Sequence, residues 1–274
     1  MTKEKLGLVL EGGGVKGAYQ VGAMKALDEL GVSYDGIAGT SIGAINGALY
    51  LDGGIEKMLT VWKEIKTNTI YELTDEEIEA IKGMNATPAI LKVLKEKRLK
   101  TIKMLADSYQ KSQNFFENLV SEDDIRSSGK EYGLVTFDIS EMQPFEKMMG
   151  DIEDGKLVDY IIASATFPIF PPKVIDGKKY IDGGVYDNMP INLLARNGYN
   201  KILVIRTNIE SKPPKRKIEK EGLDLFYITP QADLGLAMAF SSSNVHAFMT
   251  SGYADVQYCL ENGLKEFLFG NDKD

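Results

Sequence analysis

The order of apolar and polar residues predicts a chain in which β-strands alternate with α-helices. A short apolar run at residues 6–10 predicts a buried strand, and a second short strand is expected within residues 33–39. Helical spacing of apolar residues separates the two runs and ends at a glycine, which is typical of a helix end: Tyr19, Ala23, Ala26, Leu27, Leu30 and then Gly31. A helix rich in small residues follows over residues 40–54.

The same alternation returns in the second half of the chain. Strands are predicted at residues 133–140, 178–184, 201–208 and 223–230, a helix at 154–165, an exposed loop at 212–222 and a mostly helical tail from Asp233. Residues 55–130 are polar, lysine-rich and helical in pattern, without a convincing strand. The pattern predicts one α/β domain over residues 1–274 with a parallel sheet, in which residues 55–130 form a helical insertion or lid.

Composition narrows the classes of protein that this chain can belong to. The chain has 274 residues, 43% of them hydrophobic and 26% charged, which is ordinary for a globular protein. Its net charge of −8 argues against nucleic acid as a partner, because phosphate binding needs a broad basic face. A single cysteine, Cys259, excludes an internal disulfide and fits a reducing compartment, where we expect it to be a small apolar residue.

The chain is expected to be cytoplasmic, because its N-terminus lacks the apolar core of a signal peptide. No apolar run approaches the roughly 20 residues that span a bilayer, so any membrane contact is expected to be peripheral. Residues 91–105 are basic, with leucines and an isoleucine close to one helical face. Such a helix either lies on an anionic lipid surface or packs its apolar face on the core, and the second interpretation is favoured. The sequence does not indicate an oligomeric state.

Glycines near the N-terminus raise the question of which anion they bind. Gly12, Gly14 and Gly17 satisfy the dinucleotide-binding pattern G-x-G-x-x-G, and Asp35 follows at about the distance of a ribose-binding acid. A P-loop is excluded, since no Gly-Lys-Ser/Thr follows at the right spacing. Glycine amides that point together also bind a transient oxyanion, and Asp35 suits a turn better than a ribose contact. We therefore favour an oxyanion site.

A second motif supports that choice. Residues 39–43 read G-T-S-I-G, the G-x-S-x-G pattern of a nucleophile elbow, between a predicted strand and a small-residue helix. The flanking Gly39 and Gly43 permit a sharp turn that exposes the Ser41 hydroxyl at the helix N-terminus, where the dipole favours negative charge. The alternative is a tight strand-to-helix turn with a serine N-cap.

A base for this serine is suggested by Asp182, which ends a predicted strand and is followed by two glycines. The alternative is an ordinary Asp-Gly turn. The only histidine, His246, lies on a predicted tail helix and is expected to be a surface or packing residue. An ordinary aspartate has a pKa of about 3.9, so an aspartate base would depend on burial beside the serine and on strong oxyanion stabilisation.

Taken in order, G-G-G-x-K-G, G-T-S-I-G and D-G-G resemble the patatin-like phospholipase family of lipid acyl hydrolases. The segments "ASATFPIFPP" (163–172) and "DGGVYDNMP" (182–190) are similar to that family's region around its catalytic aspartate. The resemblance implies a modified α/β-hydrolase fold, a three-layer sandwich with a mainly parallel sheet. It covers roughly residues 5–50 and 155–210, so the predicted insertion is not anchored by it.

The resemblance also implies roles for single residues. Ser41 would be the nucleophile and Asp182 its base, and the backbone amides of Gly12, Gly13 and Gly14 would form the oxyanion hole. Supporting motif positions are Lys16, Gly17, Gly39, Gly43, Gly183 and Gly184. Members of the family commonly have arginine where this chain has Lys16.

The expected function is hydrolysis of fatty-acyl esters of phospholipids, lysophospholipids or related lipids through an acyl-serine, with neither metal nor cofactor. Two alternatives stay open, namely acyl transfer to an alcohol by the same Ser-Asp dyad, and a non-catalytic lipid-binding or regulatory module. Asp138, at the end of a predicted strand, is interpreted as a turn aspartate rather than a residue that shapes the site. The apolar segment 167–172 either lines an acyl channel or only forms core and turn.

Overall fold

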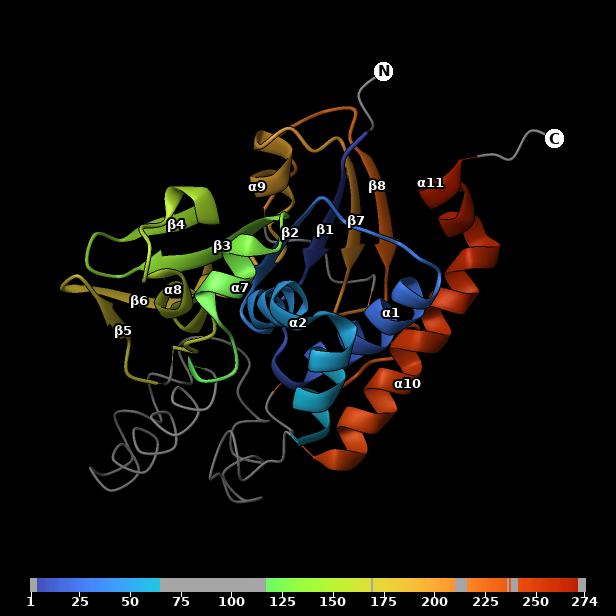
Figure 1. The fold of residues 1–274 in the computed structure, drawn as a ribbon, viewed down its shortest axis with the longest axis horizontal. Helices are drawn as coiled ribbons and strands as arrows, with labels where there is room; N and C mark the ends of the chain where they lie inside the picture. The colour runs from blue at the N-terminus through green and yellow to red at the C-terminus, as the bar shows by residue number, and fades with distance from the viewer. Residues whose placement is uncertain are drawn as a thin grey trace.

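The fold is shown by a computed structural model that describes residues 4–64, 117–168, 170–209, 216–235, 237 and 241–270 (Figure 1). Within these residues the strands form one mixed sheet in the order β5-β6-β3-β2-β1-β7-β8, and β4 pairs with β3. The strands are β1 (Leu6–Leu10), β2 (Gly36–Thr40), β3 (Glu131–Asp138), β4 (Gln143–Met148), β5 (Lys173–Ile175), β6 (Lys178–Asp182), β7 (Lys201–Ile205) and β8 (Asp224–Ile228).

Parallel pairing dominates the centre of the sheet, as the sequence predicts. β3, β2, β1, β7 and β8 are successive parallel neighbours, whereas β4 and β6 run antiparallel to β3 and β5 runs antiparallel to β6. The prediction of a mainly parallel sheet is therefore confirmed, with the antiparallel strands gathered on one side. β4 follows β3, and β6 follows β5, after a short turn, and such a hairpin reverses the strand direction.

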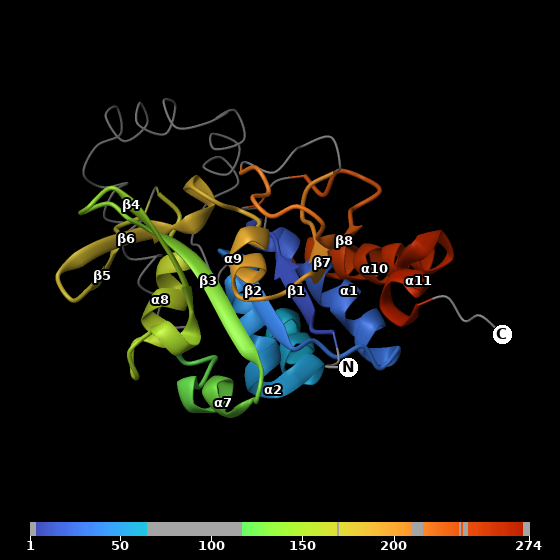
Figure 2. The same ribbon diagram turned by 90° about the horizontal axis from the view of Figure 1, so that it is seen from above.

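Helices cover both faces of the sheet and complete the three layers. Leu8 and Leu10 of β1 belong to one buried cluster, and Val9 between them belongs to a second, because successive strand side chains point to opposite faces. Figure 2 shows α9 on the opposite side of the sheet from α1, α2 and α8. The helices are η1 (Gly14–Lys16), α1 (Gly17–Glu29), α2 (Ile42–Glu64), α7 (Glu122–Ser127), η2 (Met149–Asp151), α8 (Leu157–Ser164), η3 (Gly183–Val185), α9 (Ile191–Arg196), α10 (Ser242–Cys259), η4 (Leu260–Leu264) and α11 (Lys265–Phe269).

The predicted end of the small-residue helix is confirmed. Gly53 and Gly54 interrupt α2 with non-helical backbone angles, and a second helical stretch continues to Glu64. Gly31, at the predicted stop after α1, has a φ of 73°, a left-handed conformation that glycine adopts at little cost. Residues 65–116 of the predicted insertion, and with them the basic segment 91–105, lie outside the described residues.

The segment 212–222, predicted to be an exposed loop, is only partly so. Its first residues lie outside the described part of the chain. The Arg216 side chain packs against the protein, with only 20% of its surface exposed.

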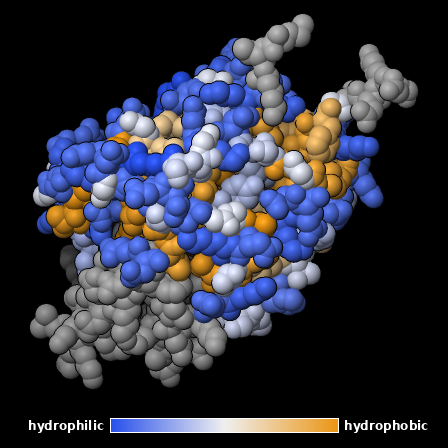
Figure 3. All heavy atoms as spheres, in the orientation of Figure 1, coloured by the Kyte–Doolittle hydropathy of each residue, from blue (hydrophilic) through white to orange (hydrophobic). Residues whose placement is uncertain are grey.

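Outside the residues drawn in grey, the face of the molecule shown in Figure 3 is mostly hydrophilic, and its hydrophobic side chains lie in separate groups. Among the described helices, none combines the length and the apolar composition that a membrane span requires.

Candidate active site

Ser41 is the single residue between the end of β2 and the start of α2, and its backbone is strained. Its φ is 57°, a left-handed conformation that residues other than glycine rarely adopt. A Cβ atom at Gly39 would lie 2.3 Å from the Gly43 carbonyl carbon, and one at Gly43 would lie 2.2 Å from the Leu10 carbonyl oxygen. Neither position has room for a side chain, so both glycines of G-x-S-x-G are required by close packing.

The glycine loop after β1 lies directly beside this turn. β1 and β2 are parallel neighbours, so the loops at their carboxyl ends open at the same edge of the sheet. A Cβ atom at Gly12 would lie 3.1 Å from the Cβ of Ser41. The Gly12 amide donates to the Asn188 carbonyl at 3.0 Å, whereas no acceptor for the amides of Gly13 and Gly14 is found among the described residues. Two donors of this loop are therefore available near Ser41.

Polar side chains form hydrogen bonds with the glycine loop and with the residue before it. The Gly12 carbonyl accepts from the Thr207 hydroxyl at 2.7 Å and from the Asn188 side-chain amide at 3.0 Å. The buried Glu11 carboxylate accepts the Thr207 amide at 2.8 Å and lies 3.6 Å from the Arg206 guanidinium. These contacts fix the backbone of the loop, which preorganised donors require.

Lys16, the position at which the related family commonly has arginine, is buried behind the same loop. Only 6% of the residue is exposed, and its ammonium group donates to the Asn208 side-chain oxygen at 3.2 Å. Gly17 follows at the start of α1, where a Cβ atom would lie 2.5 Å from Ile42. The first residues of α1 and α2 therefore pack against each other next to the elbow.

Asp182 ends β6 at the level of the elbow. β3 lies between the two strands: Thr40 pairs with Val135, and the next residue, Thr136, pairs with Asp182. The residue Asp182 is 5% exposed, and its side chain accepts the Gly184 amide at 2.7 Å. Ser41 and Asp182 therefore stand at the same edge of the sheet, although β6 runs antiparallel to β3.

Close packing also explains the two glycines that follow Asp182. A Cβ atom at Gly183 would lie 2.1 Å from the Val135 carbonyl oxygen, and one at Gly184 would lie 2.8 Å from the Asn188 side-chain oxygen. Asn188 also holds Gly12, so it connects the D-G-G turn to the glycine loop. The three motifs found in the sequence converge at one place.

Three other candidate residues lie away from this place or have structural roles. The Asp35 carboxylate accepts a hydrogen bond from the Leu6 amide at 2.8 Å. It therefore lies at the edge of the sheet where β1 begins, and this position excludes a ribose contact next to the glycine loop. His246 is exposed on α10, as expected. Cys259 is buried, and burial raises the pKa of its thiol to about 11, so it is not an activated nucleophile.

The interpretation of Asp138 as a turn aspartate is confirmed. Its side chain is buried and accepts the backbone amides of Ser140 and Glu141 at 2.8 and 3.2 Å, in the turn from β3 to β4. Among the described residues, no group of three or more His, Cys, Asp or Glu side chains is placed to hold a metal ion.

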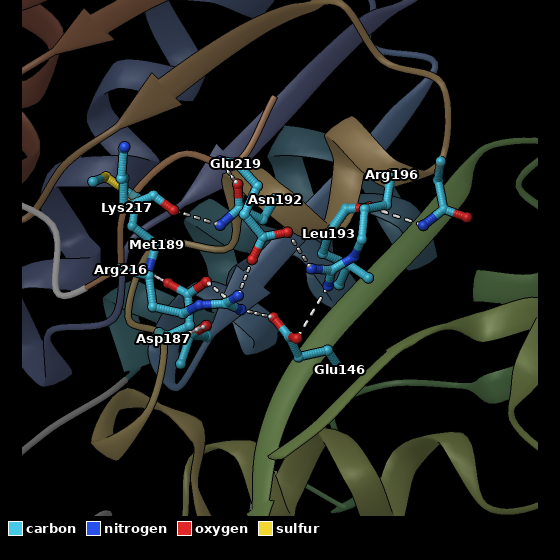
Figure 4. Close-up of polar contacts among 11 residues, drawn as sticks. Glu146, Asp187, Met189, Asn192, Leu193, Arg196, Arg216, Lys217 and Glu219 are labelled. Atoms are coloured by element: carbon cyan, nitrogen blue, oxygen red, sulfur yellow. Dashed lines mark hydrogen bonds and ion pairs between the residues drawn. The ribbon is translucent and has the colours of Figure 1, made fainter. Parts of the chain in front are cut away.

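The sequence did not indicate a cluster of charged side chains around Asp187, which includes Arg216 and Glu146 (Figure 4). Asp187 is 1% exposed, and its carbonyl accepts the Thr40 hydroxyl at 2.9 Å. Arg216 lies 3.8 Å from the Asp187 carboxylate and forms an ion pair with Glu146 at 2.9 Å. Burial raises the pKa of Asp187 to about 6. Arg216 belongs to a loop that reads as solvent-exposed, so no local signal could have paired it with Asp187.

Comparison with known sequences links the chain to one family. Residues 8–195 match the family model Patatin-like phospholipase. The chain is 27% identical over 217 residues to patatin-like phospholipase domain-containing protein 7 of Rattus norvegicus, covering 75% of this chain and 14% of that protein. It is 27% identical over 208 residues to Lysophospholipase nte1 of Aspergillus terreus, covering 73% and 12%. The chain thus spans only a small part of these relatives.

Solved structures with little sequence similarity share the fold. VipD from Legionella pneumophila aligns with a TM-score of 0.52 at 14% identity, over 94% of this chain and 67% of that chain. Human GIVD cytosolic phospholipase A2, in complex with methyl gamma-linolenyl fluorophosphonate, aligns with a TM-score of 0.53 at 10% identity, over 96% and 58%. At these identities the similarity concerns the fold alone.

Proposed function

Because this chain belongs to the patatin-like phospholipase family, we propose that it is a serine acyl hydrolase that cleaves fatty-acyl esters of phospholipids or lysophospholipids. The names of the relatives support the substrate class, since they are phospholipase and lysophospholipase proteins. The observation that carries the proposal is the convergence at Ser41. A strained serine, a glycine loop with two available amides and a buried aspartate meet at one edge of the sheet.

The proposed reaction proceeds in two steps. Asp182 accepts the hydroxyl proton of Ser41 while the serine oxygen attacks the acyl carbonyl carbon, and the Gly13 and Gly14 amides stabilise the oxyanion. The ester bond then breaks, and the departing alcohol or lysolipid takes the proton from Asp182. In the second step, water gives a proton to Asp182 and attacks the acyl-serine, and the fatty acid leaves as Ser41 regains its proton.

A fluorophosphonate probe tests the nucleophile and the base together. We expect a single adduct on the wild-type protein, mapped to Ser41 by peptide mass, and none on Ser41→Ala. Asp182→Asn should slow the labelling by about a hundredfold or more, because removal of a catalytic general base costs about 10²–10⁴ in rate. Release of fatty acid from a lysophospholipid should follow the same order.

Asp138→Asn is a matched control for Asp182→Asn. Both aspartates are buried, and both accept backbone amides in turns next to β3 and β6. The control should be labelled at nearly the wild-type rate. A folded wild type that is not labelled, with or without lipid vesicles, contradicts the proposal. Transfer of the acyl group to an added alcohol in preference to water would assign the dyad to an acyltransferase instead.

A further inference from the structure

Ser164, the last residue of α8, contacts the backbone of the proposed nucleophile. The amide of Ser41 donates to the Ser164 hydroxyl oxygen at 2.9 Å, and that hydroxyl donates to the Val135 carbonyl oxygen at 2.6 Å. Ser164 is fully buried. The two bonds form a short chain from the elbow to β3, the strand that separates Ser41 from Asp182.

The turn that follows Ser164 also holds the proposed base. The Asp182 amide donates to the Thr166 carbonyl oxygen at 2.7 Å. The Val135 carbonyl that accepts from Ser164 is the atom against which Gly183 packs. Residues 164–166 therefore contact the backbone of both proposed dyad residues, so their position affects the distance between the Ser41 and Asp182 side chains.

Ser41 needs such a contact because of its conformation. A left-handed residue between a strand and a helix has its amide outside both hydrogen-bond ladders, and this conformation is unfavourable unless its surroundings hold it. A buried amide or carbonyl that loses its hydrogen-bond partner is destabilising as well. The Ser164 hydroxyl meets both needs, because it accepts from Ser41 and donates to Val135.

From these contacts we propose that Ser164 is a positioning residue, whose hydroxyl fixes the position of the Ser41 elbow relative to Asp182. This inference rests on the proposed function, since it concerns the reactivity of Ser41. Ser164 touches no reacting atom, and its hydroxyl is engaged with Ser41 and Val135, so it is not an alternative nucleophile. Without the hydroxyl, the elbow relaxes and the serine oxygen leaves its aligned position; misplacement by about 1 Å costs on the order of a hundredfold in rate.

Tyr132 of β3 supplies a matched control. Its hydroxyl is also buried and donates to a backbone carbonyl, that of Ala44, at 2.7 Å. Ser164→Ala and Tyr132→Phe each remove one buried hydroxyl and leave one carbonyl without that donor, but Ser164→Ala also removes the partner of the Ser41 amide. Urea unfolding of both variants measures the loss of stability, so that only folded protein is compared.

The experiment measures the second-order rate of fluorophosphonate labelling at Ser41, together with kcat and KM for a soluble ester. Ser164→Ala should be labelled about 10–100 times more slowly than wild type and lose kcat by the same factor at nearly unchanged KM. Tyr132→Phe should remain within about threefold of wild type. If Ser164→Ala does not fold, Ser164→Cys fills the same position with a slightly larger thiol, which is a weaker hydrogen-bonding group, and should show the same selective loss.

Two outcomes would contradict the proposals, and they are distinguishable. Equal labelling rates for Ser164→Ala, or for Ser164→Cys in its place, and Tyr132→Phe would overturn the positioning role while leaving Ser41 as the nucleophile. A folded wild type without an adduct at Ser41 would overturn the proposed function and, with it, this inference.

Discussion

Asp187 is buried behind the nucleophile elbow with incomplete compensation of its charge. One carboxylate oxygen accepts the Met189 amide at 3.0 Å. The other makes no hydrogen bond within the described part of the chain, and the nearest guanidinium, that of Arg216, is 3.8 Å away. Burial is the main cause of the raised pKa, and Glu146 adds to it, while Arg216 and Arg196 act against it.

The raised pKa of Asp187 predicts a pH-dependent cost to stability. An aspartate with a pKa of about 6 in the folded protein and 3.8 as its ordinary value binds its proton more tightly when folded. Its favourable contribution is complete below pH 3.8 and is lost as the pH rises through about 6. Asp187→Asn, which does not titrate, should therefore gain about 1 kcal/mol of stability relative to wild type between about pH 5 and pH 8.

Urea unfolding of wild type and Asp187→Asn at both pH values measures this difference. The comparison across pH cancels the effect of the substitution on packing, because that effect does not depend on protonation. A stability difference that stays constant with pH would show that Asp187 does not titrate in this range.

At the scale of elements, the helices α1 and α10 approach so closely that their glycines contact backbone. A Cβ atom at Gly22 of α1 would lie 1.9 Å from the Met249 carbonyl oxygen, and one at Gly252 of α10 would lie 2.0 Å from the Tyr19 carbonyl oxygen. The Tyr19 hydroxyl also donates to Asp255 at 2.9 Å across this interface. The close crossing requires glycine at both positions, because neither has room for an added methyl group.

Gly22→Ala is therefore expected to destabilise the protein despite the better helix propensity of alanine. Alanine gains at most about 1 kcal/mol over glycine inside a helix, whereas separating two packed helices costs typically about 1–3 kcal/mol. Because the clash is with backbone, we expect a net loss of about 1–2 kcal/mol in the free energy of unfolding. Gly150→Ala is the control, because a Cβ atom there meets nothing within 4 Å. Equal stability of the two variants would contradict the close crossing.

At the scale of the molecule, one buried cluster joins residues from both ends of the chain. It extends from Leu8 of β1 to Phe267 of α11 and includes Trp62 of α2. Trp62 is the only tryptophan, is fully buried, and donates to the Asn46 side chain at 2.8 Å. We propose on this basis that residues 1–274 form one domain that unfolds as a unit.

Trp62 makes this proposal measurable. Tryptophan fluorescence and far-UV circular dichroism should give the same urea midpoint, because loss of the shared cluster removes the packing that most helices need. Fluorescence should shift to longer wavelength in a single transition. A fluorescence transition that precedes the loss of helix would show that the region around α2 unfolds independently.

Local patterns along the chain determined much of the fold and the identity of the candidate site. The apolar runs of β1, β2, β3 and β7 were predicted, because buried parallel strands are short and nearly continuous in hydrophobicity. β4 and β5 were missed. They are edge strands whose residues are mostly exposed or half-buried, so they lack that signal. Ser41 was identified because the glycines that a sharp elbow requires are its neighbours in the sequence.

Only the tertiary structure decided how these pieces meet. The hydrogen bond between Ser164 and Ser41 joins residues 123 positions apart. Neither a serine at a helix end nor an arginine in a lysine-rich loop indicates in the sequence which residue it will contact. The antiparallel pairing of β6 with β3 likewise joins segments more than 40 residues apart, Thr136 with Asp182, and no local pattern indicates it. Residue types and short spacings record local steric needs, such as a glycine beside a strained serine. Contacts between distant segments depend on how the whole core packs, so they can be known only once the chain is folded.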